Sequence, residues 1–224
     1  KPKLFQMNAF IFLAANDPTN PNNEKYQARA KEWVYKTIPH EQTMKAMLDD
    51  FSKVPSSKPA WTHAYQLILL SEYYLQTGDK KVLPAIRAYA VCFAKGQSWL
   101  GTVGHGYALK RPDGGFNGPM AGYGAINGSG VAGFLGLVLA RKCGVESPEI
   151  ARAIERADLF FGHFAFRGGI GYGEYGPALG KCMYDMNGKH ATNALALALQ
   201  PKRAKESRYF MKMTACSGYN RAYG

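Results

Sequence analysis

Three acidic residues lie in the two glycine-rich stretches of the sequence. Glu174 stands in GYGEYG, Asp185 in YDMNG and Asp113 in RPDGG. A glycosidase needs two carboxyl groups that flank the scissile bond, roughly 5–9.5 Å apart. The neighbouring glycines would let Glu174 and Asp185 reach a common cleft, so we expect these two to be the candidate catalytic acids. Pro-Asp-Gly is a strong turn signal, which favours a structural role for Asp113.

Histidine and tyrosine offer a second, lyase-like chemistry. His190 or His105 would pair with Tyr172 as base and acid, while Arg111 or Asn117 neutralised a substrate carboxylate. His190 falls in the first turn of an expected helix, where the helix dipole would lower its pKa. A lone histidine at such a place also suits a purely structural role, and this alternative stays open.

The same glycine-rich stretches carry tyrosines, including Tyr107, Tyr123 and Tyr172. Aromatic rings beside polar groups suit sugars, because the C–H faces of a sugar stack on rings while its hydroxyls need polar partners. We therefore expect these tyrosines, with His105, to contribute to ligand binding. The alternative is that they brace the loops and meet no ligand.

Metal and cofactor chemistry finds little support. The 168–171 run GGIG is no dinucleotide fingerprint, since no strand precedes it. No serine nucleophile elbow, P-loop or HExxH motif is present. No two cysteines form a C-x-x-C pair, so we expect free buried thiols and neither a metal nor a cofactor. The cysteines are Cys92, Cys143, Cys182 and Cys216.

The charge balance is strongly basic, with 28 Lys and Arg against 16 Asp and Glu and a net charge of +12. An excess of this kind favours an anionic partner. The densest basic group lies within residues 202–212, on an expected amphipathic helix, which is more typical of a solvated helix face than of a nucleic-acid-binding stripe. Nucleic acid is therefore not the favoured partner, and no apolar run is long enough to span a membrane.

Hydrophobic periodicity predicts an all-α fold made of helical hairpins. Residues 60–76, 128–143 and 188–200 are apolar nearly all round, whereas 80–95, 148–164 and 202–216 are apolar on one side only. A helix that is apolar all round must be surrounded by protein, and an amphipathic helix faces water on its charged side. We expect an inner helix followed by an outer helix in each pair. Residues 4–15 and 24–38 form a further pair, and 40–51 form a short helix.

The connections alternate in length. Short turns fall at 77–79, at 144–147 and near 201, whereas long loops fall at about 38–59, 96–126 and 165–187. This alternation places every long loop at one end of the hairpins, and long loops within compact domains are usually functional. Gly-Pro and Asn-Gly recur at spacings of 58 and 60 residues, which is typical of a repeat. We expect one domain over 1–224, with hairpins at about 4–38, 60–95, 128–164 and 188–216.

Alternating inner and outer helices, with the hairpin turn LQTGD at 75–79, resemble the α/α-toroid superfamily over residues 60–224. That superfamily includes six-hairpin glycosidases, toroidal polysaccharide lyases and terpenoid cyclases with prenyltransferases. The GYG, GP and NG loops, each followed by an apolar helix, most resemble an uncharacterised bacterial family of this fold. The acidic Asp-x-Asp-Asp motif of the cyclases is absent, and 184–187 does not match it. The zinc ligands of the prenyltransferases have no counterpart.

The resemblance implies a carbohydrate hydrolase or lyase, or a protein that binds a glycan or another anionic ligand on the long-loop face. The alternative is a non-catalytic helical scaffold for protein contact or assembly. Members of the resembling family are often exported, which implies a periplasmic or extracellular bacterial protein. Toroids of this kind have five to seven hairpins, whereas the sequence supplies four. We therefore expect an arc, or a part of a longer protein.

Overall fold

The structure, a computed structural model, describes residues 9–50, 54, 59–108, 124–173 and 188–223, with side chains of the last helix up to residue 215. Every regular element in this part of the chain is helical, which confirms the expected all-α fold. Residues 9–14 form a first helical segment. The main helices are α2 (Asn23–Tyr35), α3 (Glu41–Asp49), α4 (Pro59–Thr77), α5 (Leu83–Gly96), α6 (Asn127–Lys142), α7 (Pro148–His163), α9 (Lys189–Ala198) and α10 (Ala204–Tyr223). A short 3-10 turn, η2 (Lys80–Val82), precedes α5.

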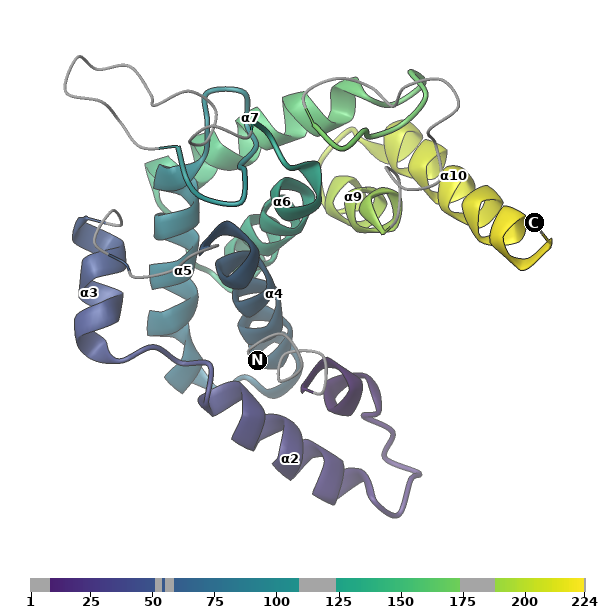
Figure 1. Cartoon of the computed structure of the whole chain (residues 1–224). Coiled ribbons are helices and arrows are strands. Elements are labelled where there is room, and N and C mark those ends of the chain that lie inside the picture. Colours follow the sequence, from purple (N-terminus) through teal and green to yellow (C-terminus); the bar gives the residue numbers. More distant parts are fainter. Residues whose placement is uncertain (1–8, 51–53, 55–58, 109–123, 174–187, 224) are drawn as a thin grey trace.

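The helices lie in two curved rows. Helix α6 packs between α4 and α9 in the inner row, while α5, α7 and α10 lie outside them (Figure 1). Helix α6 is surrounded by protein, since every residue from Ser129 to Ala140 is buried. Helix α7 buries one stripe only and exposes its charged side, as an outer helix should. The described hairpins thus form an arc, and a closed ring stays a prediction.

Two helices depart from the expected polarity. Helix α5 was expected to expose a charged face, yet α3 packs against it and leaves Arg87 and Pro84 among its few exposed residues. Lys95 of α5 donates a hydrogen bond to the carbonyl of Leu48 in α3, so the charged side of α5 is partly used for packing. Helix α9 was expected to be buried all round, but Leu195 is 47% exposed.

Three glycines give α6 its close contacts. Gly130, Gly133 and Gly136 face different neighbours, because residues three apart advance around the helix. A Cβ atom added to Gly133 would lie 1.7 Å from the ring of Phe93 in α5, and one added to Gly136 would lie 3.0 Å from Leu67 in α4. The side-chain hydroxyl of Thr102, in the loop after α5, occupies the space beside Gly130. The glycine row therefore permits the close approach of side chains from several neighbouring segments.

The short turns share one backbone device, which supports the repeat. Each inner helix is followed by a residue with positive φ: Gly78 at 68°, Gly144 at 80° and Lys202 at 66°. A left-handed residue after a helix redirects the chain, and glycine adopts it without strain. The side chains of Asp79 and Ser147 then accept a backbone N–H and cap the next element. The third turn performs the same reversal with a lysine.

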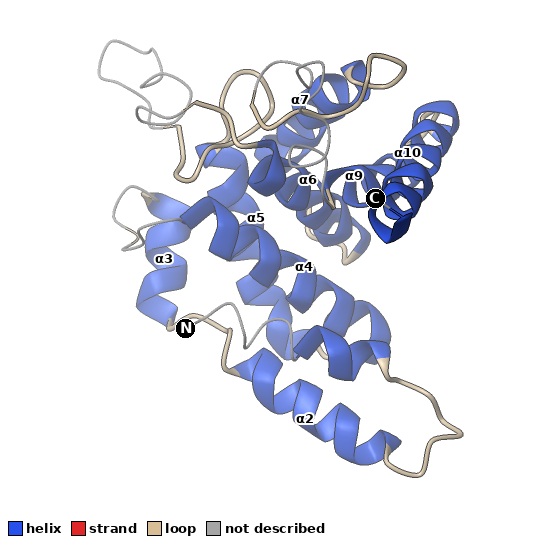
Figure 2. Ribbon diagram, turned by 45° about the vertical axis from the view of Figure 1, so that its right-hand side comes forward, coloured by secondary structure: helices blue, strands red, loops and turns tan. Residues whose placement is uncertain are grey.

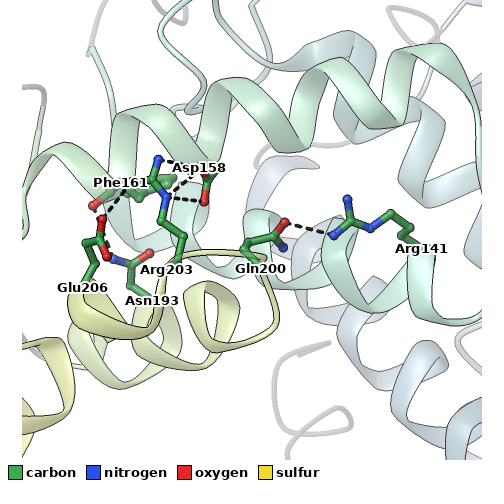
Figure 3. A network of polar contacts seen from close by, with 7 residues as sticks. All are labelled: Arg141, Asp158, Phe161, Asn193, Gln200, Arg203 and Glu206. Carbon is green, nitrogen blue, oxygen red and sulfur yellow. Dashed lines mark hydrogen bonds and ion pairs between the residues drawn. The ribbon is translucent and has the colours of Figure 1, made fainter. Parts of the chain in front are cut away.

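The last hairpin is fastened to the one before it by polar contacts (Figure 3). The guanidinium of Arg203 donates to the carboxylate of Asp158 in α7, with a shortest distance of 2.7 Å, and to Glu206 at 2.9 Å. Arg141 near the end of α6 donates to the side-chain oxygen of Gln200 at 2.9 Å. These contacts fix the position of α9 and α10, and thereby one wall of the candidate site.

Candidate functional site

The two long loops meet at the start of α6. Figure 2 shows the loop that precedes α6 and the loop that follows α7 together at the top of the molecule. The backbone N–H of Ile126 donates to the carbonyl of Val103, and that of Asn127 donates to the carbonyl of Tyr172, both at 2.9 Å. Segments almost 70 residues apart are therefore joined at one helix end, as the alternation of connection lengths predicts.

Asn127 is the centre of this junction. Its side chain is fully buried and donates to the carbonyls of Gly171, at 3.1 Å, and Gly173. Its side-chain oxygen lies 3.5 Å from the hydroxyl of Thr102. No side-chain cap bond forms at the start of α6, and Asn127 is itself the first residue of the helix. The amide group instead binds two loops to each other.

An inner groove lies between the first helical segment and the inner helices, beside this junction. Its volume is about 410 Å³, within the range of roughly 300–1,000 Å³ that is typical of small-molecule sites. Residues of the first helical segment and of α4, α6 and α9 line it: Phe10, Trp61, Tyr65, Ile68, Gly128, Val131, Ala132, Leu135, Gly188, Lys189 and Thr192. Each inner helix contributes residues at its start, so the groove reaches the long-loop end.

Trp61 is the best-fixed side chain of the inner groove. Its indole N–H donates to Nδ1 of His105 at 2.9 Å, and its ring stacks on Tyr65 with centroids 6.3 Å apart. On the third side it lies against Gly128, where an added Cβ atom would come within 2.7 Å of the ring. The indole is therefore held in one orientation by the loop that contains His105, by Tyr65 of its own helix and by Gly128 of α6. The result is a preorganised aromatic surface.

Equivalent positions of the three inner helices form the walls. Trp61, Tyr65 and Ile68 follow one another at i, i+4 and i+7 on α4, and residues 128, 132 and 135 do the same on α6. On α9 the equivalent positions are 188, 192 and 195. This spacing puts each set on one helix face. The repeat thus presents the same stripe three times, with aromatic and aliphatic residues on α4, small and aliphatic ones on α6, and glycine, threonine and leucine at the α9 positions.

The α9 wall carries the positive charge of the groove. Lys189 is only 7% exposed, and its ammonium lies 5.8 Å from the ring centroid of Tyr172. The described residues that line the groove include no carboxylate. The first-turn N–H groups of α6 and α9 add partial positive charge at the same end.

His190, a candidate catalytic base, has a structural position instead. It is 2% exposed and packs on Phe210 of α10. Its Nε2 accepts the backbone N–H of Ile170 at 3.0 Å, and Gly169 is too close to carry a side chain. Burial, with a contribution from Lys189, lowers the pKa of His190 to about 4. The neutral ring therefore anchors the second long loop to α9.

Tyr107 is also buried, although the sequence places it on an exposed loop. Its ring fills the space beside Gly96, and its hydroxyl lies 2.8 Å from Nδ1 of His63. Burial lowers the pKa of His63 to about 4 and raises that of Cys92, 3.8 Å away, to about 12. A neutral histidine and an un-ionised thiol suit a packed core, so this cluster anchors the first long loop rather than exposing a binding tyrosine.

Of the other candidates, Tyr172 is 45% exposed and does not line the groove, and His105 is half-buried beside Trp61. Five candidates lie outside the described residues: Arg111, Asn117, Tyr123, Glu174 and Asp185. Their catalytic and binding roles stay predictions. Among the described residues no group of histidine, cysteine or acidic side chains could hold a metal ion.

The residues that form the groove walls carry no motif that marks them in the sequence. Trp61 and Tyr65 look like core residues, because the helix that contains them is apolar nearly all round. Lys189 follows a glycine-rich stretch and belongs to no known motif. The spacing of two aromatic residues could have indicated the groove. Trp61 and Tyr65 stand at i and i+4 in the first turns of an inner helix, where the indole N–H or the phenol hydroxyl can reach the loop end.

The fold and the groove define a class: an all-α protein of helical hairpins with a groove at the loop end of its inner helices. The chain belongs to the family described as Domain of unknown function (DUF6288), whose family model matches residues 1–224. A comparison with curated proteins gave no significant match, and neither did one with solved structures. Within the described chain, no helix combines the length and apolar character that crossing a membrane requires.

Proposed function

We propose that this protein binds a glycan or another anionic ligand in the inner groove. The observation that carries the proposal is the fixed aromatic pair Trp61 and Tyr65 facing a wall that contains Lys189, with both long loops gathered at the same helix ends. A flat apolar face of the ligand would lie on the indole, and its anionic group would lie near the start of α9. The excess of basic residues favours the same charge.

Calorimetric titration with neutral and uronate-containing oligosaccharides tests this proposal. Trp61→Ala should weaken binding at least about five-fold, the equivalent of about 1 kcal/mol of lost aromatic contact. Trp99→Ala is the matched control, since Trp99 is 67% exposed and does not line the groove. If no oligosaccharide or other small anion binds, or if the two variants behave alike, the groove is not the binding site. A helical scaffold then becomes the better account.

Catalysis on a bound glycan remains part of the proposal through Glu174 and Asp185. Two carboxyl groups could serve hydrolysis, and the exposed Tyr172 could assist a lyase. Turnover of the oligosaccharide panel by Glu174→Gln and Asp185→Asn variants tests this role. Unchanged turnover in both variants would remove these carboxyls from the mechanism, while binding in the groove would stand independently.

A further inference from the structure

The inner helices meet the long loops at equivalent positions. Residues 63, 130 and 190 stand two places after the first groove position of α4, α6 and α9. The hydroxyl of Tyr107 lies 2.8 Å from Nδ1 of His63, and the backbone N–H of Ile170 donates to Nε2 of His190 at 3.0 Å. A hydroxyl can donate or accept, so His63 can keep its bond when charged, whereas an N–H only donates. The bond of His190 is therefore the one that a proton breaks.

The surroundings of His190 require a neutral ring. Because Nε2 accepts the N–H of Ile170, the ring proton is on Nδ1. Nδ1 is buried, and no hydrogen-bond partner for it lies among the described residues. A charged ring carries a proton on both nitrogens. One proton would face the N–H of Ile170 and the other would have no acceptor, so the charged ring is strongly disfavoured while the loop is bound.

The second long loop packs closely on this ring. His190 is 2% exposed and Ile170 is fully buried. Gly169 has a φ of 92°, and a Cβ atom added to it would lie 2.5 Å from Nε2 of His190 and 2.9 Å from the side chain of Met213 in α10. On its other side the ring packs on Phe210 of α10. Nothing lies between ring and loop, so a change of charge on Nε2 acts directly on Ile170.

Lys189 is the charged group that acts on His190. Burial is the larger cause, and the positive charge of Lys189 adds to it, in lowering the pKa of the ring to about 4. The carboxylates of Asp158 in α7 and Glu206 in α10 are both paired with Arg203. The remaining ionisable residues of the described loop and of the described side chains of α10 are exposed or half-buried: Arg167, Tyr172, Lys205, Arg208, Tyr209 and Lys212.

We infer that the contact between His190 and Ile170 is an acid-sensitive latch, which releases residues 165–170 from α9 and α10 when Nε2 takes up a proton from solvent. The side-chain amide of Asn127 does not titrate, and it continues to hold the carbonyls of Gly171 and Gly173. Acid therefore opens one side of the loop and leaves the junction at the start of α6 intact. The latch works whether or not the inner groove binds a glycan.

The direction of the pH effect follows from the two states of the ring. The pKa of His190 is about 4 in the latched state against an ordinary value of 6.5 once the ring is in water. A lowered pKa stabilises the latched state fully above about pH 6.5, and this stabilisation is lost as the pH falls towards 4. The equilibrium constant for opening should therefore rise roughly 20-fold between pH 7 and pH 5.

Hydrogen exchange of single amides, followed by NMR at pH 7 and pH 5 and corrected for the intrinsic rate at each pH, tests the latch on the unmodified protein. Protection of the Ile170 amide should fall roughly 20-fold. The amide of Asn127, which donates to the carbonyl of Tyr172, should keep its protection. Unchanged protection at Ile170 would overturn the latch. Equal loss at both amides would also overturn it, because acid would then open the whole junction.

Two pairs of variants assign the effect to the ring. His190→Gln takes up no proton, so the acid response of Ile170 should disappear, whereas His163→Gln, at an exposed histidine of α7, should retain it. Gly169→Ala forces the loop off the ring and should remove the protection of Ile170 already at pH 7. Gly168→Ala strains the backbone at a similar φ of 87° but meets no neighbour within 4 Å, so the acid response should remain. An undiminished acid response in His190→Gln would assign the release to another group and overturn the inference.

Discussion

Gly133 is the position in α6 where one added methyl group should have the largest effect. An ideal Cβ atom there would lie 1.7, 2.2 and 2.4 Å from three ring atoms of Phe93. Contacts below 3.0 Å are essentially never seen for real Cβ atoms. Phe93 is fully buried in α5, so its ring cannot turn into solvent to make room. Gly133→Ala must therefore displace either the ring or the two helices.

Two effects of opposite sign compete in this variant. Helix propensity alone favours alanine over glycine by about 1 kcal/mol. Displacing the Phe93 ring should cost about as much as removing it, which is about 3–5 kcal/mol for a core phenylalanine. The difference is a net loss of about 2–4 kcal/mol in the free energy of unfolding. For a chain of this length the melting temperature should fall by roughly 4–16 °C.

Thermal and urea unfolding followed by circular dichroism measure this loss. Gly136→Ala is the matched control on the same helix, since its Cβ atom would meet the side chain of Leu67 at 3.0–3.3 Å, a much milder contact that a shift of a few tenths of an ångström relieves. Combining Gly133→Ala with Phe93→Leu should recover part of the loss. A Gly133→Ala protein as stable as the parent, or more stable, would refute the packing of α5 on α6, because propensity alone predicts that result.

Three other changes should alter stability. Lys202→Gly should raise the free energy of unfolding by about 1 kcal/mol, since a left-handed lysine is strained and glycine is not. Thermal unfolding measures this, and a lower melting temperature in the variant would contradict the prediction. Asp158→Asn should cost about 1–2 kcal/mol, because it removes a partly buried ion pair with Arg203; an unchanged urea midpoint would show that this pair does not fasten the last hairpin. The pKa of His63 is about 4 in the fold against an ordinary 6.5. The unfolded chain therefore binds the extra proton, and His63 should contribute about 3 kcal/mol to the fall in stability as pH drops from 6.5 to 4. His190, with the same lowered pKa, contributes a fall of its own; a His63→Gln variant whose stability fell as much as that of the parent would contradict the contribution of His63.

Helix existence and helix order could be predicted from the sequence with little error. The inner helix expected at 60–76 is Pro59–Thr77, and the outer helix expected at 148–164 is Pro148–His163. Periodicity and capping signals determine these bounds locally. The side on which α3 packs could not be predicted, because its pattern says only that one face is apolar and not which helix it meets.

The candidate site was harder to predict, since the burial of a loop residue depends on residues that are distant in the sequence. Tyr107 looks exposed in a glycine-rich stretch, yet the missing side chain of Gly96 opens a place for its ring. His190 looks available at a helix start, yet the loop end at Ile170 folds back and donates to it. Neither partner is visible in the local sequence. The loop end itself was predicted, because alternating connection lengths follow from the chain alone.

Hydrogen–deuterium exchange of an Asn127→Ala variant most directly tests the central claim, that both long loops meet at the start of α6 beside the inner groove. The side-chain amide of Asn127 contacts Thr102 in one loop and Gly171 in the other. We expect faster exchange in residues 97–108 and 165–173 together, with the rest of α6 unchanged. Faster exchange confined to residues next to position 127, or in one loop only, would contradict the junction and the groove built on it.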